Sequence, residues 1–200
     1  NIDKEYESPY TIIGDYAFSD CETLISIVLP ETVTYIGNSA FKRCALLSEI
    51  NIPNSVITIG AGAFEQCERI ETIDIPASVQ YMGSNPFVGC TKLGNIIVSS
   101  DNPYISMEDG VLTSNDDHRL IFCHPLMIDK EFVVPDGIEI IDSYALSNID
   151  SLETVTLSNT VRIIGEYSFA NCEKLSGIVF PASVSSIESV AFSTNDTISP

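Results

Sequence analysis

The 200-residue chain contains no tryptophan, only two histidines, and nine lysines and arginines against 28 aspartates and glutamates. The resulting net charge of −19 at pH 7 repels a phosphate backbone or an anionic lipid surface. The composition therefore predicts that the protein does not bind nucleic acid.

The chain also lacks an apolar run long enough to cross a bilayer, so we expect no direct membrane insertion. It does not open on a charged stretch followed by an apolar one, and its first residue is Asn1 rather than methionine. We therefore expect a mature form or a fragment, with any targeting signal or anchor outside these residues.

Motifs that carry chemistry are scarce as well. The sequence has no Gly-x-Ser-x-Gly, P-loop, His-Glu-x-x-His or dinucleotide fingerprint. His118 and His124 lie near Cys123 and Asp116–Asp117, but the adjacent Cys123 and His124 would point to opposite faces of a strand. The acidic turns at Glu108-Asp109 and at 115–117 lack the loop pattern that gives calcium its oxygen ligands, so solvated turns are the favoured interpretation. We expect no catalytic residues, no metal and no cofactor.

The chain does contain a tandem repeat. Phe18, Phe41, Phe64 and Phe87 are spaced 23 residues apart, and a cysteine follows each of them three positions later. A period of this size is typical of a solenoid, in which each unit buries its apolar face only by stacking on its neighbours. We expect one domain over residues 1–200.

The cysteines at this repeat position are Cys21, Cys44, Cys67, Cys90 and Cys172. On adjacent units of a solenoid their Cβ atoms would lie about 4.8 Å apart with parallel Cα–Cβ vectors. A disulfide needs Cβ atoms about 3.8 Å apart that point toward each other, and a zinc site needs ligands that converge. The spacing therefore predicts buried, reduced thiols.

Within one unit, the segment 36–44 has apolar residues at a helical spacing and predicts a short helix or helical turn. Ile50 and Ile52 then alternate with Asn51 as in a half-buried strand, and Pro53 follows. The same pattern predicts ladder strands around residues 27–29, 50–52, 73–75, 96–98, 132–134, 155–157 and 178–180.

Residues 99–131 break the repeat. Three β-prone runs, 104–107, 111–114 and 119–124, are separated by turn signals at Asp109-Gly110 and Asn115–Asp117. We expect a β-hairpin or small meander inserted into the solenoid. The unit that starts at Ile141 departs from the repeat too, with Asp142 for glycine, Leu146 for phenylalanine and Ile149 for cysteine.

The repeat Ile-Gly-x-x-Ala-Phe-x-x-Cys-x-x-Leu-x-x-Ile-x-Ile-Pro-x-x-Val resembles the BspA-like, or treponemal-type, leucine-rich repeats of bacterial surface proteins. The resemblance implies an α/β, β-rich leucine-rich repeat solenoid: a right-handed superhelix of 23-residue repeats with a parallel ladder on the concave face and an inserted β-hairpin. It also implies an exported or surface-attached protein associated with adhesion, and it implies no catalytic residues.

In such a solenoid, the strand residues that alternate with the buried ones point outward from the concave face. A merely solvated sheet is the alternative to a binding surface, because these residues lack the aromatic and arginine side chains of interface hot spots. The candidates are Ser26, Val28, Glu49, Asn51, Thr72, Asp74, Asn95, Ile97, Thr154 and Thr156, with Glu131, Val133, Gly177 and Val179 in the same register. Tyr35 and Tyr81 share another repeat position, where packing is favoured over function.

The leading hypothesis is a non-enzymatic cell-surface or secreted binding module. Its partner would be a host or microbial surface protein, an extracellular-matrix protein or a glycan. The alternative is an intracellular or structural scaffold for protein interactions.

Overall fold

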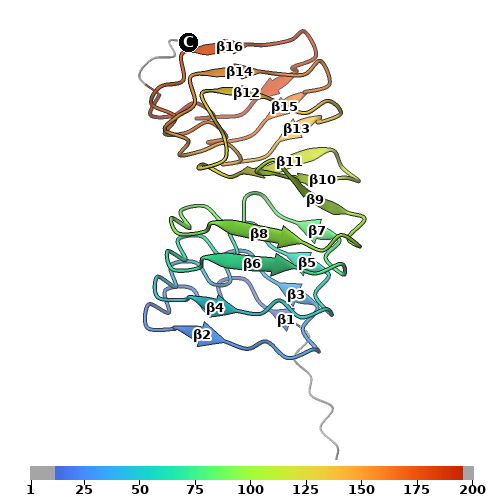
Figure 1. Ribbon diagram of the computed structural model, residues 1–200, viewed down its shortest axis with the longest axis vertical. Helices are drawn as coiled ribbons and strands as arrows, with labels where there is room; N and C mark the ends of the chain where they lie inside the picture. The colour runs from blue at the N-terminus through green and yellow to red at the C-terminus, as the bar shows by residue number, and fades with distance from the viewer. Residues whose placement is uncertain (1–11, 196–200) are drawn as a thin grey trace, which may run out of the picture.

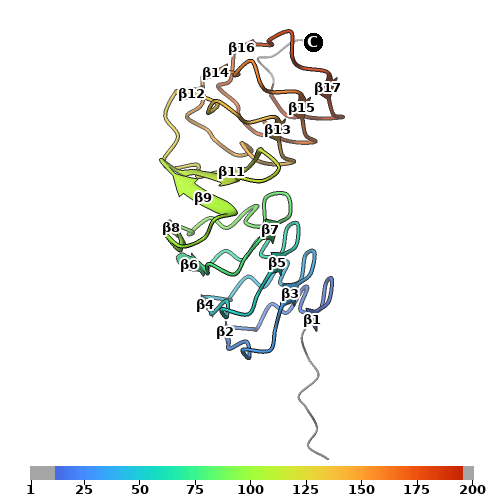
Figure 2. The same cartoon turned by 90° about the vertical axis from the view of Figure 1, so that its right-hand side faces the viewer.

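A computed structural model describes residues 12–195, which form an elongated stack of repeats with the first and last described residues at opposite ends (Figure 1). We call each repeat a rung. Two rows of short strands follow the stack on opposite sides (Figure 2). The stack of 23-residue rungs with parallel ladders confirms the predicted leucine-rich repeat solenoid.

The first row carries the strands that the alternating pattern predicts, and we call its outer surface the strand face. Its strands are β2 (Ser26–Ile27), β4 (Glu49–Ile50), β6 (Thr72–Ile75), β8 (Asn95–Val98), β12 (Glu131–Val133), β14 (Thr154–Thr156) and β16 (Gly177–Val179). They pair in parallel as β2–β4, β6–β8 and β12–β14–β16. In β6, Thr72 and Asp74 are exposed while Ile73 and Ile75 are buried, as expected for a sheet with one face in the core. Each predicted strand is present and begins about one residue earlier than expected.

The second row was not expected as strands. It consists of β1 (Ile12–Ile13), β3 (Tyr35–Ile36), β5 (Thr58–Ile59), β7 (Tyr81–Met82), β13 (Ile140–Ile141), β15 (Ile163–Ile164) and β17 (Ser186–Ile187). The partners in β1–β3–β5–β7 are offset by one rung, for example Ile36 with Ile59. Two residues are too few to show alternation, so the sequence pattern could not reveal this ladder.

Turns replace the expected short helix between the second row and the cysteine, and no residue from 12 to 195 is helical. In the segment 36–44, the amides of Ser39, Phe41 and Arg43 donate to the next rung, to the carbonyls of Ala61, Ala63 and Glu65. These amides are therefore not available to the carbonyl four residues back, as a helix would require. The helical part of the α/β expectation is corrected to turns.

Backbone dihedrals show where the helix is interrupted. Ser39 (φ 51°) and Arg43 (φ 59°) are both left-handed, and the equivalent residues of the other rungs also have positive φ. A left-handed residue cannot continue a right-handed helix. The equivalent positions are Tyr16, Gly62, Asn85, Tyr144, Tyr167 and Val190 for the first turn, and Asp20, Gln66, Gly89, Asn148, Asn171 and Thr194 for the second.

The phenylalanines stack through the core as the period predicts. Ring centroids are 5.1 Å apart for Phe18–Phe41, 5.6 Å for Phe41–Phe64 and 5.9 Å for Phe64–Phe87, with nearly parallel planes. Truncation of one ring to alanine removes apolar burial and leaves a cavity, which costs roughly 3–5 kcal/mol. The expected aromatic spine is confirmed.

All six cysteines are free thiols. The thiol of Cys44 donates to the carbonyl of Phe18 at 3.1 Å, and Cys67 and Cys90 repeat this contact with Phe41 and Phe64. Burial raises the pKa of Cys44 to about 11 and that of Cys90 to about 12, so both are protonated donors at neutral pH. The repeated cysteine is therefore a hydrogen-bond donor that ties one rung to the one before it.

Asn195 occupies the cysteine position of the last described rung and takes over this role. Its amide nitrogen donates to the carbonyl of Phe169 at 2.6 Å, and its amide oxygen accepts from the backbone N–H of Cys172 at 2.8 Å. The departure from cysteine therefore preserves the contact between rungs.

The insert forms the predicted antiparallel meander, from β9 (Ile105–Glu108), β10 (Val111–Ser114) and β11 (Arg119–Cys123). It also joins the solenoid, because β11 pairs in parallel with β13. Leu112, Ile121 and Phe122 pack into the core of the N-terminal rungs. Leu120 and Cys123 pack into the core of the C-terminal rungs. The insert is thus the layer through which the two cores meet.

A buried ion pair fastens this layer. The guanidinium of Arg119 lies 2.6 Å from the carboxylate of Asp142 and 2.5 Å from that of Asp117, and it donates to the carbonyl of Met82 at 2.8 Å. It also lies over the ring of Tyr81, 4.9 Å from the centroid. Asp142 stands where several other rungs have glycine, and its carboxylate pairs with Arg119 of the insert. The insert therefore explains this departure from the repeat.

Candidate functional site

The strand face presents the sequence-predicted candidates to solvent in two columns, one from each outward strand position. Ser26 is paired with Glu49, Thr72 with Asn95, and Glu131 with Thr154 in the first column. The second column contains Val28, Asn51, Asp74, Ile97, Val133, Thr156 and Val179. Every predicted candidate from Ser26 to Thr156 is exposed. The register therefore brings them together on one continuous side of each half of the stack.

The second column is more apolar than the overall composition of the candidates suggests. Val28 is 84% exposed, Val179 79%, Val133 66% and Ile97 54%. When a partner covers hydrophobic side chains of this exposure, the complex is stabilised by about 25 cal/mol per Å² of apolar surface buried. Asp74 and Thr156 interrupt the column with polar groups that can fix the orientation of a partner.

Asn51 is the exception among the candidates, because its side chain already has a structural task. Its amide oxygen accepts from the backbone N–H of Leu29 at 2.8 Å, and its amide nitrogen donates to the Leu29 carbonyl at 3.2 Å. The side chain thus extends the ladder where β2 ends, and a partner would have to compete with two hydrogen bonds.

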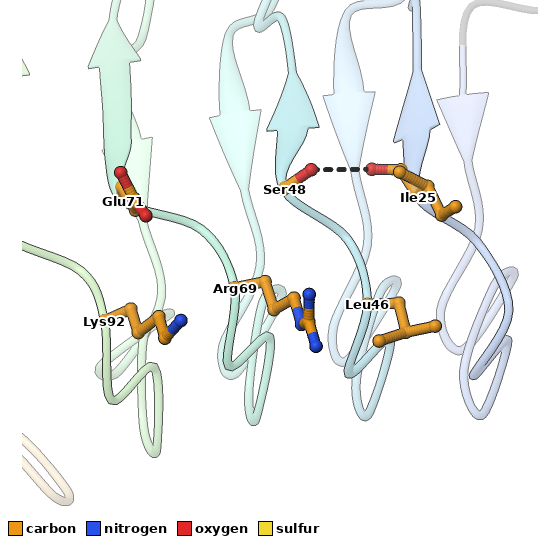
Figure 3. A pocket seen from close by; sticks show the side chains of 6 residues that line it. All are labelled: Ile25, Leu46, Ser48, Arg69, Glu71 and Lys92. Atoms are coloured by element: carbon orange, nitrogen blue, oxygen red, sulfur yellow. Dashed lines mark hydrogen bonds between the residues drawn. The ribbon is translucent and has the colours of Figure 1, made fainter.

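Beside the strand face lies an open depression of about 220 Å³, which we call the corner depression (Figure 3). Ile25, Ser48 and Glu71 stand at one repeat position, immediately before β2, β4 and β6. Leu46, Arg69 and Lys92 stand at another, two residues after a cysteine. The Ser48 hydroxyl donates to the carbonyl of Ile25 at 3.3 Å. The depression combines an apolar part with two cationic side chains.

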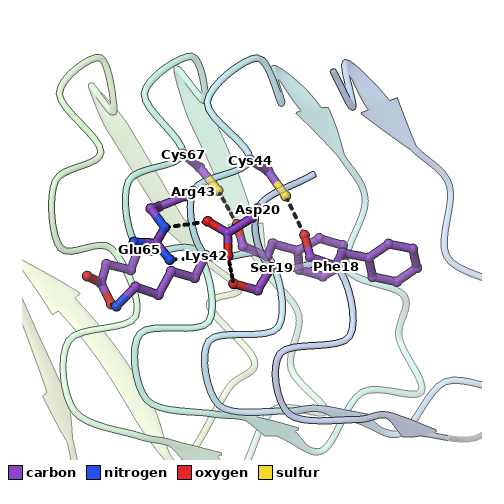
Figure 4. A network of polar contacts seen from close by, with 9 residues as sticks. Phe18, Ser19, Asp20, Lys42, Arg43, Cys44, Glu65 and Cys67 are labelled. Carbon is purple, nitrogen blue, oxygen red and sulfur yellow. Dashed lines mark hydrogen bonds and ion pairs between the residues drawn. The ribbon is translucent and has the colours of Figure 1, made fainter. Parts of the chain in front are cut away.

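On the turn side, most charges are paired between rungs (Figure 4). Arg43 lies 2.6 Å from Asp20, and Lys42 lies 2.8 Å from Glu65. The hydrogen bond from Arg43 holds the pKa of Asp20 below its ordinary value. The charges of the exposed Arg43–Asp20 pair and of the half-buried Lys42–Glu65 pair satisfy one another, so this side offers less free charge to a partner than the corner depression does.

His124 and Cys123 of the insert are buried and have structural roles. The Nε2 of His124 lies 2.8 Å from the carbonyl of Leu93, and its Nδ1 accepts from the backbone N–H of Leu126. Burial raises the pKa of Cys123 well above its ordinary value, which leaves a thiol rather than a nucleophilic thiolate. Within residues 12–195, no three His, Cys, Asp or Glu side chains are grouped so that they could hold a metal ion.

A second hollow of about 370 Å³ lies between the insert and the loop before β13. Glu108, Asn115, His118 and Asp136 contribute to its lining. Asn115 is already engaged, because its side chain bonds the Ser106 hydroxyl and the Pro103 carbonyl.

The tyrosines at the shared repeat position lie in the second row of strands. Tyr35 is half-buried, whereas Tyr81 is 48% exposed with the Arg119 guanidinium over its ring. Tyr81 therefore supports the ion pair at the insert. No helix among residues 12–195 is long and apolar enough to span a membrane.

Residues 8–109 and 122–199 match the BspA type leucine rich repeat region, in six copies. The chain belongs to the BspA-type leucine-rich repeat family. The match leaves out residues 110–121, the middle of the insert, which agrees with the insert being an interruption of the BspA-type rungs.

Solved structures of bacterial proteins share the fold. A leucine rich cell surface protein from Faecalibacterium prausnitzii is 27% identical over 92% of this chain and 55% of its own, with a TM-score of 0.78. The pneumococcal vaccine antigen PcpA is 31% identical over 86% of this chain and 43% of its own, with a TM-score of 0.74. A leucine-rich repeat protein from Eubacterium ventriosum, 17% identical over 96% of this chain and 82% of its own, shows the fold with a TM-score of 0.62.

The chain thus spans about half the length of the first two of these proteins. No curated protein matches it.

Arg69 and Lys92 were not among the candidates predicted from the sequence. They occupy a position that varies between the rungs of this chain, whereas the predicted candidates are all strand positions. Their common spacing from Cys67 and Cys90 was the available signal, because equal repeat positions lie on adjacent rungs.

Proposed function

We propose that the protein is a non-enzymatic binding module of the bacterial cell surface or of the secreted fraction, and that it binds a protein partner on its strand face. The observation that carries the proposal is the exposed apolar column, in which Val28, Ile97, Val133 and Val179 lie among polar side chains on one side of the stack. Exposed apolar side chains set among polar ones on one face are the composition of many protein–protein contact surfaces.

The fold supports the same conclusion. Leucine-rich repeat proteins are typically non-catalytic binding scaffolds, in which stacked repeats build an extended surface. The relatives include a cell surface protein and a vaccine antigen, which supports a surface location for this protein. Extracellular-matrix proteins and the surface proteins of host or microbial cells are the proposed partners, and a glycan is the second class to test.

The test is a binding screen against immobilised matrix proteins, cell-surface extracts and glycans. A strand-face variant carries Thr72→Glu, Asn95→Lys, Asp74→Lys and Ile97→Glu, which places opposite charges across the β6–β8 pair and so spares the sheet. Binding to a matrix or surface protein should be lost in this variant.

The matched control changes the other side of the stack. Ile57→Glu with Gln80→Lys alters two exposed residues beside the second row of strands, whose backbones are hydrogen-bonded to each other. This control should bind like the wild type. Equal binding by the strand-face variant and the wild type would disprove the location of the site, and binding only to glycans would disprove the class of partner. Labelling of intact producing cells with a membrane-impermeant reagent tests the location of the protein.

A further inference from the structure

Arg69 and Lys92 differ from most other cations of the chain because they lack an acidic partner. Lys42, Arg43, Arg119, Lys130 and Arg162 each form an ion pair. Within residues 12–195, Arg69 and Lys92 form none, although the chain carries a net charge of −19. Unpaired cations are therefore placed side by side on a protein that has acidic groups to spare.

Their position in the repeat brings them together. The two residues are 23 positions apart and stand on consecutive rungs, which lie about 4.8 Å apart. Like charges on consecutive rungs repel each other in the free protein, and a bound anion offsets this repulsion. In Figure 3 both side chains lie along the same side of the corner depression, with Leu46 next to Arg69.

The rest of the depression defines what kind of anion fits. Ile25 is 61% exposed, and Leu46 is half-buried, so a ligand meets apolar surface next to the cations. Glu71 lies across from the two cations, in the row of Ser48 and Ile25 (Figure 3), and would repel a densely charged polyanion. One carboxylate can face Arg69 and Lys92 while an adjoining aliphatic side chain covers Ile25 and Leu46.

We infer that the corner depression binds an acidic, aliphatic peptide segment of the protein partner, with its carboxylate on Arg69 and Lys92. This inference rests on the proposed function, since it assumes a protein partner on the strand face. The depression adjoins that face at the residues before β2, β4 and β6, so one partner can contact both. An arginine guanidinium offers paired donors that match a carboxylate, and the lysine adds a second charge.

The probe is the capped peptide acetyl-Leu-Glu-Leu-Glu-amide, titrated into 15N-labelled protein. We expect saturable shifts of the backbone amides of Ser48, Arg69 and Glu71. Two exposed ion pairs imply that the Arg69→Gln/Lys92→Gln variant binds the peptide roughly 3- to 10-fold more weakly. The dissociation constant should also rise with NaCl, because exposed charges are screened.

Lys174→Gln provides the matched control. Lys174 stands two residues after Cys172, at the same repeat position, but its neighbour on the preceding rung is Ser151 rather than a second cation. This variant should bind the peptide like the wild type. All substitutions are at exposed positions, and thermal unfolding followed by circular dichroism verifies that each variant is folded.

Three results would overturn the inference. They are unchanged binding in the double variant, equal binding of a peptide in which glutamine replaces glutamate, and tighter binding of sialyllactose or a heparin fragment than of the acidic peptide. The strand-face variant separates the two proposals, since its corner depression is intact and it should still bind the peptide. Loss of the protein partner's binding in that variant, with no effect of the double variant, would disprove the peptide site alone.

Discussion

Replacement of Arg119 by methionine should destabilise the protein at the insert. The change removes the ion pairs with Asp117 and Asp142, the hydrogen bond to the Met82 carbonyl and the contact with the Tyr81 ring. It keeps an unbranched apolar side chain in place of the aliphatic stem of arginine and leaves the carboxyl of Asp142 buried without its cation. Breaking a buried pair in this way costs about 3–5 kcal/mol of unfolding free energy at pH 8.

The loss should depend on pH because of Asp142. Burial raises the pKa of this carboxyl to about 6 from an ordinary value of 3.8, even though Arg119 lowers it. The folded protein therefore holds the proton more tightly than the unfolded chain, and ionisation of Asp142 opposes folding above pH 6. That contribution amounts to roughly 3 kcal/mol at full ionisation and fades as the pH falls toward 4.

The Arg119→Met variant should accordingly lose less at pH 5, where the buried carboxyl is protonated. The lost ion pair with Asp117, the lost hydrogen bond to Met82 and the lost ring contact then remain, together about 1–4 kcal/mol. Urea unfolding followed by circular dichroism at pH 8 and pH 5 measures both values. A loss below about 1 kcal/mol at pH 8, or an equal loss at both pH values, would refute the reasoning.

Two controls separate charge from packing. The double variant Arg119→Met/Asp142→Gly restores the glycine of the other rungs and removes the unpaired carboxyl. It should be more stable at pH 8 than the single variant. Arg43→Met removes an exposed pair with Asp20 and should leave the unfolding free energy close to that of the wild type.

Further predictions follow from the rungs themselves. Phe64→Ala should lower the unfolding free energy by roughly 3–5 kcal/mol in urea titrations, and a loss near zero would contradict a packed spine. Gly60→Ala should shift the unfolding midpoint downward strongly, because the added Cβ would lie 2.5 Å from the backbone of the preceding rung. Gly14→Ala, with nothing within 4 Å, should not, and equal effects of the two would argue against that clash. Gln66→Gly should raise the thermal midpoint, since the left-handed φ of 58° costs a non-glycine residue about 1 kcal/mol. Burial raises the pKa of Cys67 far above its ordinary value, so its thiol should react with a disulfide reagent at pH 8 only after unfolding.

Much of the fold could be predicted because its signals are local. Ile73 and Ile75 are buried while Thr72 and Asp74 are exposed, and this alternation alone places β6 with one face in the core. The stacked rings of Phe41 and Phe64 follow from the period, because equal repeat positions must lie above one another. The thiol ladder follows for the same reason.

The turns could not be predicted in the same way. The apolar spacing in 36–44 fits a helix, but the amides of Ser39, Phe41 and Arg43 bond the next rung. The same amides can bond carbonyls of their own segment, as in a helix, or carbonyls of the next rung. Which carbonyls they bond depends on how the rungs stack, and the residue pattern of a single repeat does not describe that stacking.

The candidate site shows the same division. The outward positions of the strands, such as Asp74 and Ile97, follow from alternation. The engagement of Asn51 with Leu29 and the corner depression around Arg69 and Lys92 appear only when neighbouring rungs are placed beside one another.

By itself, the sequence determined the repeat, the stacking of identical positions, the face that each strand residue takes and the place of the insert. These depend on a fixed period and on the separation of apolar from polar residues, which any stacked arrangement of the chain must respect. Only the tertiary structure decided the second ladder, the left-handed turns, and the pairing of Arg119 with Asp142 and Met82. The second ladder and the left-handed turns depend on hydrogen bonds between neighbouring rungs. The contacts of Arg119 depend on how the insert folds between the two cores, because a buried guanidinium needs partners for its charge.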